Sequence, residues 1–265
     1  MNHIKKFTFC DCRSLVNISL EHVVRINEGA FADCVNLTEV QLGRLQSIGP
    51  YAFTKTGLTR VSLGGGLVDI GEQAFCGCIA LTQVDLSVSL RSIQEFAFSE
   101  CGLLELEAPP GAALDIIEQS AFEACEALAT VDLRNAVLLE RMTDSVFMDC
   151  RALTTLHLPP NLRRIDHAAF NQSGLVSVEL PASLKRLGHR AFANCTDLKR
   201  ADLSKCTRLR LARAGVGKGV FVGCDQLSEV VLPRGMGSTE HLHALGLNGF
   251  TLSHRGESDL VFQRK

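Results

Sequence analysis

The sequence predicts a repeat solenoid with mainly β structure, built from about ten coils of 22–25 residues that share a parallel sheet on one face. Three observations predict this fold. A phenylalanine returns at nearly constant spacing, a cysteine follows most of these phenylalanines by three residues, and a six-residue Leu-x-x-Val-x-Leu segment comes next. Because one such unit is too short to bury its own apolar residues, the units have to stack on one another.

The phenylalanines mark the coils. Successive members lie 22 to 25 residues apart, except that the last interval is 29. The series is Phe9, Phe31, Phe53, Phe75, Phe98, Phe122, Phe147, Phe170, Phe192 and Phe221. Alanine precedes seven of the ten, and its small side chain allows close packing of the backbone. We therefore expect the Ala-Phe-x-x-Cys segment to form a helical or turn-like side of each coil.

Most of the cysteines share one position of the repeat. Eight of the eleven stand three residues after the phenylalanine of their coil: Cys12, Cys34, Cys78, Cys101, Cys125, Cys150, Cys195 and Cys224. Thr56 and Ser173 take this place in the two remaining coils. Free cysteine is among the most buried residue types and behaves as a small hydrophobe, so we expect a ladder of unpaired, buried thiols.

Two further positions of the repeat predict strands. The Leu-x-x-Val-x-Leu segments alternate apolar and polar residues, which is typical of a half-buried strand. These segments are residues 15–20, 37–42, 58–63, 81–86, 103–108, 128–133, 153–158, 175–180, 198–203 and 227–232. An apolar residue five positions before the phenylalanine predicts a short second strand: Ile26, Ile48, Ile70, Ile93, Ile117, Met142, Ile165, Leu187 and Val216.

The repeat also sets the expected domain boundaries. The solenoid is predicted to occupy residues 1–235, and residues 236–265 are predicted to form a C-terminal cap that covers the last coil with Phe250, Leu252, Leu260 and Phe262. The long last interval predicts a loop over residues 204–219, beyond the end of a strand.

The order Leu-x-x-Val-x-Leu, then often Pro, then Ile, then Ala-Phe-x-x-Cys resembles the BspA-type, or Treponema pallidum-type, leucine-rich repeat over about residues 7–235. The resemblance implies a right-handed leucine-rich-repeat superhelix. Members of that family are bacterial and protist proteins, many of them at cell surfaces, and they are implicated in adhesion to host proteins. The resemblance therefore implies a role in protein binding. The alternative interpretation is that the chain is a fragment of a cell-surface adhesin or antigen.

Other functional classes find no support in the sequence. The formal net charge is −2, and there is neither the mixture of basic and aromatic residues that single-stranded nucleic acid requires nor an apolar run long enough to cross a membrane. No nucleophile motif is recognisable, and His241 and His243 lack a third metal ligand. We assign no catalytic, cofactor-binding or metal-binding residues. We expect a non-catalytic scaffold that binds a protein partner through the sheet face or an edge of the solenoid, while the oligomeric state stays open.

Charge is segregated along the chain. Residues 1–133 hold 8 Lys and Arg against 17 Asp and Glu, whereas residues 134–213 hold 14 against 7. An acidic stripe follows the outward side of the predicted strands and forms the candidate protein-binding face: Asp85, Glu105, Glu107, Asp132, His157, Glu179 and Asp202. Like charges on neighbouring strands repel. We therefore expect a protein partner with a basic surface, the alternative being a solvated face.

Two other segments are the next candidates for partner binding, namely the basic region 134–213 and the loop 204–219. Residues 1–12 do not resemble a secretory signal, and reduced thiols favour a reducing compartment. We therefore expect an intracellular, cytoplasmic location, or the cell surface if the chain is a fragment of a longer secreted protein.

Overall fold

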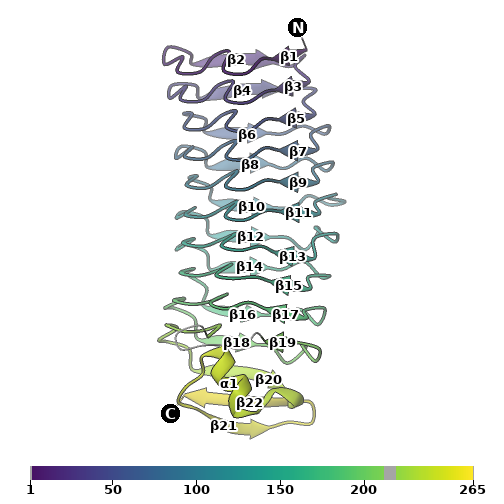
Figure 1. Ribbon diagram of the computed structural model, residues 1–265, viewed down its shortest axis with the longest axis vertical. Coiled ribbons are helices and arrows are strands. Elements are labelled where there is room, and N and C mark those ends of the chain that lie inside the picture. The colour runs from purple at the N-terminus through teal and green to yellow at the C-terminus, as the bar shows by residue number, and fades with distance from the viewer. Residues whose placement is uncertain (1, 212–218, 265) are drawn as a thin grey trace.

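Every coil contributes one strand to each of two sides of an elongated stack, as the successive arrows of Figure 1 show. The computed structural model describes residues 2–211 and 219–264. The strands of successive coils pair in parallel, and helix is confined to the C-terminal end of this part of the chain. The predicted solenoid is confirmed, and the predicted number of coils agrees roughly with the observed one.

The Leu-x-x-Val-x-Leu segments form the longer strands, which make the main sheet. In chain order these strands are β2 (Asn17–Leu20), β4 (Glu39–Leu42), β6 (Arg60–Ser62), β8 (Gln83–Asp85), β10 (Glu105–Glu107), β12 (Thr130–Asp132), β14 (Thr155–His157), β16 (Ser177–Glu179), β18 (Arg200–Asp202) and β20 (Glu229–Pro233). In three-residue strands such as β10, β12 and β16, the apolar middle residue faces the core while its two neighbours face outward, as the predicted period of two requires.

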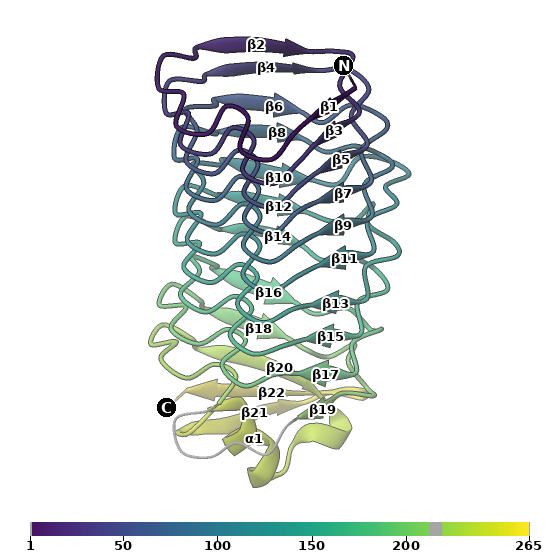
Figure 2. The same cartoon turned by 45° about the horizontal axis from the view of Figure 1, so that its top comes forward.

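The second sheet lies across the core from the main sheet (Figure 2). Its two-residue strands are β1 (His3–Ile4), β3 (Arg25–Ile26), β5 (Ser47–Ile48), β7 (Asp69–Ile70), β9 (Ser92–Ile93), β11 (Ile116–Ile117), β13 (Arg141–Met142), β15 (Arg164–Ile165), β17 (Arg186–Leu187) and β19 (Arg210–Leu211). The ladder divides into β1–β11 and β13–β19. This division coincides with the change from the acidic to the basic half of the chain.

One expectation about the second sheet falls outside the described residues. The sequence assigns Val216 as the inward residue of the last coil; among the described residues, Leu211 pairs with Leu187 of the neighbouring strand. Residues 212–218 lie outside the described residues. They include Val216 and most of the second half of the predicted loop 204–219.

The third side of the coil consists of turns, which settles the choice between a helical and a turn-like segment. Residues two before and two after the repeated phenylalanine adopt positive φ, as Tyr51 (58°) and Lys55 (54°) do around Phe53. This conformation costs a non-glycine residue about 1–2 kcal/mol. Hydrogen bonds between coils oppose that cost, for example from the Phe53 N–H to the Ala74 carbonyl at 2.7 Å.

The core is a column of stacked phenylalanine rings flanked by the aliphatic residues of both sheets. Centroids of successive rings lie 5.1–5.7 Å apart, and their planes deviate by at most 19°. Most thiols of the cysteine ladder donate to the carbonyl of the phenylalanine one coil earlier, as Cys125 Sγ does to Phe98 O at 3.1 Å. All eleven cysteines are unpaired. Seven of the eight predicted ladder members are buried, and Cys12 is half-buried.

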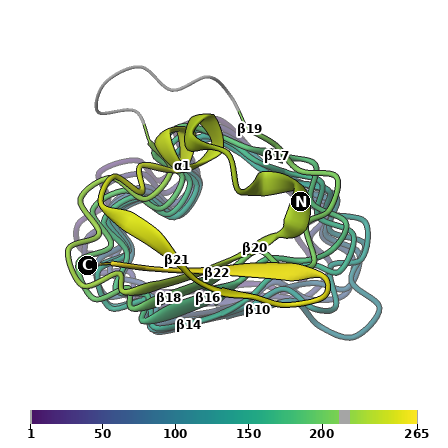
Figure 3. The ribbon, with the colours of Figure 1, turned by 90° about the horizontal axis from the view of Figure 1, so that it is seen from below.

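The C-terminal segment continues the main sheet. Strands β21 (Phe250–Arg255) and β22 (Asp259–Arg264) form a hairpin whose second strand pairs antiparallel with β20 (Figure 3). Between them and the last coil lie a short 3-10 helix, Arg234–Met236, and α1 (Thr239–Leu245). No helix within residues 2–211 and 219–264 is long and apolar enough to cross a membrane. The boundary at residue 235 and the capping role stay predictions.

Candidate protein-binding face

The main sheet holds the whole acidic stripe on its outward surface. Asp85, Asp132, His157, Glu179 and Asp202 end strands β8, β12, β14, β16 and β18, and Glu105 and Glu107 flank the buried Leu106 in β10. Register places Glu107, Asp132 and His157 side by side on three neighbouring strands. A second ladder places Glu179 beside Asp202. The strand register therefore joins the residues of the stripe in two separate groups.

Most of the stripe is neutralised by cations of the same chain. Arg60 pairs with Asp85 at 2.9 Å, Arg134 with Asp132 at 2.5 Å, and Lys205 with Glu179 at 2.6 Å. Arg200 bridges Asp202 and Glu229 at 2.9 and 2.7 Å. The repulsion expected between stacked acids is thus relieved within the chain at these four positions, so it does not by itself require a partner.

The two most covered carboxylates of the stripe bind hydrogen-bond donors. Hydrogen bonds from the Arg134 side chain hold the pKa of Asp132 below its usual value. Burial raises the pKa of Asp202, but hydrogen bonds from Ser204 together with Arg200 outweigh it and leave the pKa lowered. Both groups are ionised at neutral pH and occupied by neighbours, which leaves them little capacity to accept further donors.

Glu105 and Glu107 differ from the rest of the stripe. Both are exposed, and neither forms an ion pair with any described residue. Together with Asp85, Pro109 and Pro110, they line a hollow of about 310 Å³. A shallow acidic depression with a rigid rim can receive a Lys or Arg side chain.

Sequence reasoning missed the in-chain cations and the hollow. The cations stand at no constant offset, because Arg134 follows its Asp132 by two residues whereas Lys205 reaches back a full coil to Glu179. Two Asp-x-Arg or Arg-x-Asp spacings could have indicated part of the pairing. The Pro109-Pro110 pair could have marked a rigid edge beside β10.

Within the described residues, no group of three or more His, Cys, Asp or Glu side chains is arranged to hold a metal ion. His157 is exposed at the end of β14, beside Asp132 in the register. The charged groups of this face lie spread over a surface and do not converge on one enclosed point, an arrangement that suits contact with a macromolecule.

Comparison with known proteins identifies the family of the repeats. The family described as BspA-type leucine-rich repeat region (6 copies) matches residues 2–129 and 115–242. A search of curated proteins gave no match.

Solved structures with similar chains come from several bacteria. A leucine-rich repeat protein of Treponema pallidum is 22% identical, with 80% of this chain and 82% of that chain covered and a TM-score of 0.44. A leucine-rich repeat protein from Bacteroides ovatus is 20% identical, with 86% and 81% covered and a TM-score of 0.38. A leucine-rich cell surface protein from Faecalibacterium prausnitzii is 19% identical, with 92% and 86% covered and a TM-score of 0.41.

Proposed function

Since the chain belongs to the BspA-type leucine-rich repeat family, we propose that it is a non-catalytic scaffold that binds a protein partner on the outward face of its main sheet. The observation that carries this proposal is the acidic hollow formed by Asp85, Glu105 and Glu107. There the carboxylates of β10 form no ion pair with any described residue, whereas the remaining acids of the stripe are already paired.

The partner that fits this face is a protein segment rich in Lys and Arg. Its cations can donate charge-assisted hydrogen bonds to Glu105 and Glu107, and the acidic half of the chain steers its approach. His157, Glu179 and Asp202 lie further along the stripe and extend the same surface for a longer partner. The contribution of the paired acids is smaller, because a partner cation has to displace Arg134, Arg200 or Lys205.

Charge reversal tests this assignment. The double variant Glu105→Lys, Glu107→Lys should lower the affinity for a fluorescent peptide of alternating Lys and Ser at least tenfold at low ionic strength, as measured by anisotropy. The control variant Glu95→Lys, Glu100→Lys makes the same change in net charge on exposed residues of the neighbouring turn side. It should change affinity less than twofold.

Two outcomes contradict the proposal. Equal losses in the two variants mean that only net charge matters, and equal binding of a Gln and Ser peptide means that charge does not matter. If the double variant alone weakens binding, affinity purification with the wild-type chain and the double variant follows. The natural partner is then the protein that only the wild-type chain retains.

The cysteines support a proposal about the compartment. We propose a reducing, intracellular location, because all eleven thiols are unpaired and the burial of eight of them suits reduced cysteine. The alternative is that the chain is a fragment of a cell-surface adhesin. Thiol counting by mass spectrometry on protein isolated from its own cells distinguishes them, since native disulfides contradict the reducing compartment.

A further inference from the structure

Arginine occupies the same register position in four successive strands of the second sheet. Arg141, Arg164, Arg186 and Arg210 open β13, β15, β17 and β19, and each is paired with the next in the parallel ladder. Strands of a sheet lie about 4.8 Å apart, so four positive side chains are brought into one column. Such a column is unfavourable unless anions lie between its members.

The first two arginines of the column share an anion that the chain supplies. The carboxylate of Asp166 accepts a hydrogen bond from Arg141 Nε and another from Arg164 Nη2, the latter at 2.9 Å. Asp166 is only 8% exposed. A buried carboxylate thus links the arginine of its own coil to the arginine one coil earlier.

The next coil repeats the arginine but lacks the carboxylate. Gly188 follows Arg186 by two residues, as Asp166 follows Arg164. A Cβ atom at Gly188 would lie 2.6 Å from the carbonyl carbon of Asp166, so the chain cannot place a side chain there without moving its backbone.

The missing carboxylate leaves donors unsatisfied. Arg164 Nε is buried and has no hydrogen-bond partner, although the same atom of Arg141 is bound by Asp166. Arg186 and Arg210 form no ion pair with any residue in the described ranges. One coil after the Arg141–Asp166–Arg164 group, two arginines therefore lie side by side again, but without a carboxylate of the described residues between them.

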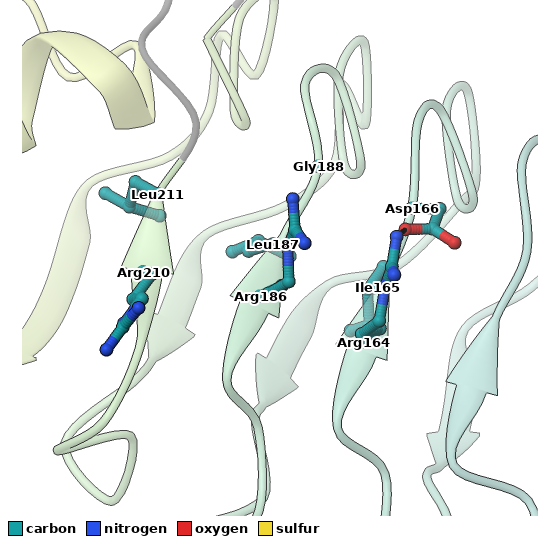
Figure 4. Close-up of a pocket in the computed structure, with 8 residues that line it drawn as sticks. All are labelled: Arg164, Ile165, Asp166, Arg186, Leu187, Gly188, Arg210 and Leu211. Carbon is teal, nitrogen blue, oxygen red and sulfur yellow. Dashed lines mark hydrogen bonds and ion pairs between the residues drawn. The ribbon is translucent and has the colours of Figure 1, made fainter.

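These residues surround a hollow of about 360 Å³, which we call the arginine cradle. Arg164, Asp166, Arg186, Gly188 and Arg210 line it together with the inward aliphatic residues. Figure 4 shows the Arg186 side chain running beside Gly188, while the Arg164 side chain lies against Asp166. Gly188 occupies the repeat position that Asp166 holds one coil earlier, and both residues line this hollow.

We propose that the arginine cradle binds a carboxylate from an acidic segment of a partner protein. The carboxylate lies beside Gly188 and accepts hydrogen bonds from Arg164 Nε and the Arg186 guanidinium, as Asp166 does from Arg141 and Arg164. A second carboxylate, one coil further along, fits between Arg186 and Arg210. The chain's own use of a carboxylate at the equivalent position favours this anion over a sulfate or phosphate ester.

This inference goes beyond the proposed function, because it concerns the other sheet and a partner segment of opposite charge. The probe is a fluorescein-labelled peptide with four Glu residues, and the comparison is its Gln counterpart. We expect saturable binding of the Glu peptide at low ionic strength. Arg186→Gln should weaken that binding at least fivefold, measured by anisotropy.

The matched control is Arg163→Gln. It removes the same charge from the residue next to Arg164, but Arg163 is paired with Glu140 at 3.0 Å and does not line the cradle. It should weaken binding less than twofold. Arg164→Lys keeps the charge and removes Nε, so it should weaken binding at least threefold. In spectra of ¹⁵N-labelled arginine side chains, the Arg164 Nε–H signal should shift on binding.

Three results overturn the proposal. The first is equal weakening by Arg186→Gln and the Arg163→Gln control, which indicates diffuse attraction. The second is unchanged affinity of the Arg164→Lys variant together with an unshifted Nε signal. The third is binding of a sulfated hexasaccharide or inorganic phosphate by the wild-type chain when the Glu peptide does not bind.

Discussion

Replacement of one central ring of the phenylalanine column is expected to destabilise the solenoid strongly but locally. Phe122 is fully buried and stacks on Phe98 and Phe147, with centroids 5.3 Å away on both sides. Truncation of such a residue to alanine costs about 3–5 kcal/mol. Loss of two stacked pairs, each worth about 0.5–1.5 kcal/mol, places Phe122→Ala near the upper end of that range.

The position of a ring in the column sets the size of the effect. Phe9 is half-buried and stacks on one ring, Phe31, at 5.1 Å, so Phe9→Ala should cost about 2 kcal/mol. Phe122→Leu keeps most of the volume and should cost about 1.5 kcal/mol. Urea unfolding gives the free energies, and amide hydrogen exchange shows which coils open.

Because coils contact only their neighbours, exchange in Phe122→Ala should accelerate in the adjacent coils and fall off toward both ends. Equal loss of protection in every coil would show one cooperative unit. An unchanged free energy of unfolding would refute the role given to the column.

Further predictions follow from the thiols, the turns and the paired acids. Exposed Cys10 should react first with iodoacetamide. The buried thiols of the ladder should react slowly, because burial raises the pKa of a thiol such as Cys125 to about 12. After unfolding, all eleven thiols should react. Gly77→Ala should lower the free energy of unfolding by about 1 kcal/mol, because the φ of Gly77 is 71°. The folded pKa of Asp132 lies below its unfolded value, so its stabilising contribution is present above about pH 4 and is lost as pH falls through the folded pKa. Arg134→Gln should therefore flatten the acid limb of a stability-against-pH curve measured by urea unfolding.

The core could be predicted from the sequence because each of its positions recurs in every coil. Ten phenylalanines at nearly regular spacing fix which residues stack, and the inward residues of both sheets follow from that spacing. The sequence assigns the last inward position to Val216, which lies outside the described residues, while Leu211 pairs with Leu187; this is the coil where the spacing changes to 29. Where periodicity stops, the sequence no longer indicates which of two nearby aliphatic residues pairs with the neighbouring coil.

The surface was less predictable, because pairing there does not repeat. The acidic stripe could be placed on the outward face from the period of two, but its partners could not. Arg60 reaches forward one coil to Asp85, and Lys205 reaches back one coil to Glu179. Long side chains select whichever carboxylate lies within reach, so position in the repeat does not determine the pair.

Local pairing also explains why the two candidate sites lie where they do. In a solenoid each coil contacts only its neighbours, so a charge must be neutralised within about one coil or remain available. In the acidic half, Glu105 and Glu107 form no ion pair with any described residue. In the basic half, Arg186 forms none either, and Gly188 stands at the position of the carboxylate. Segregation of charge along the chain favours such unpaired groups, because neighbouring coils carry mostly charges of the same sign. We therefore propose a site for cations on the main sheet and a site for anions on the second sheet of one rod.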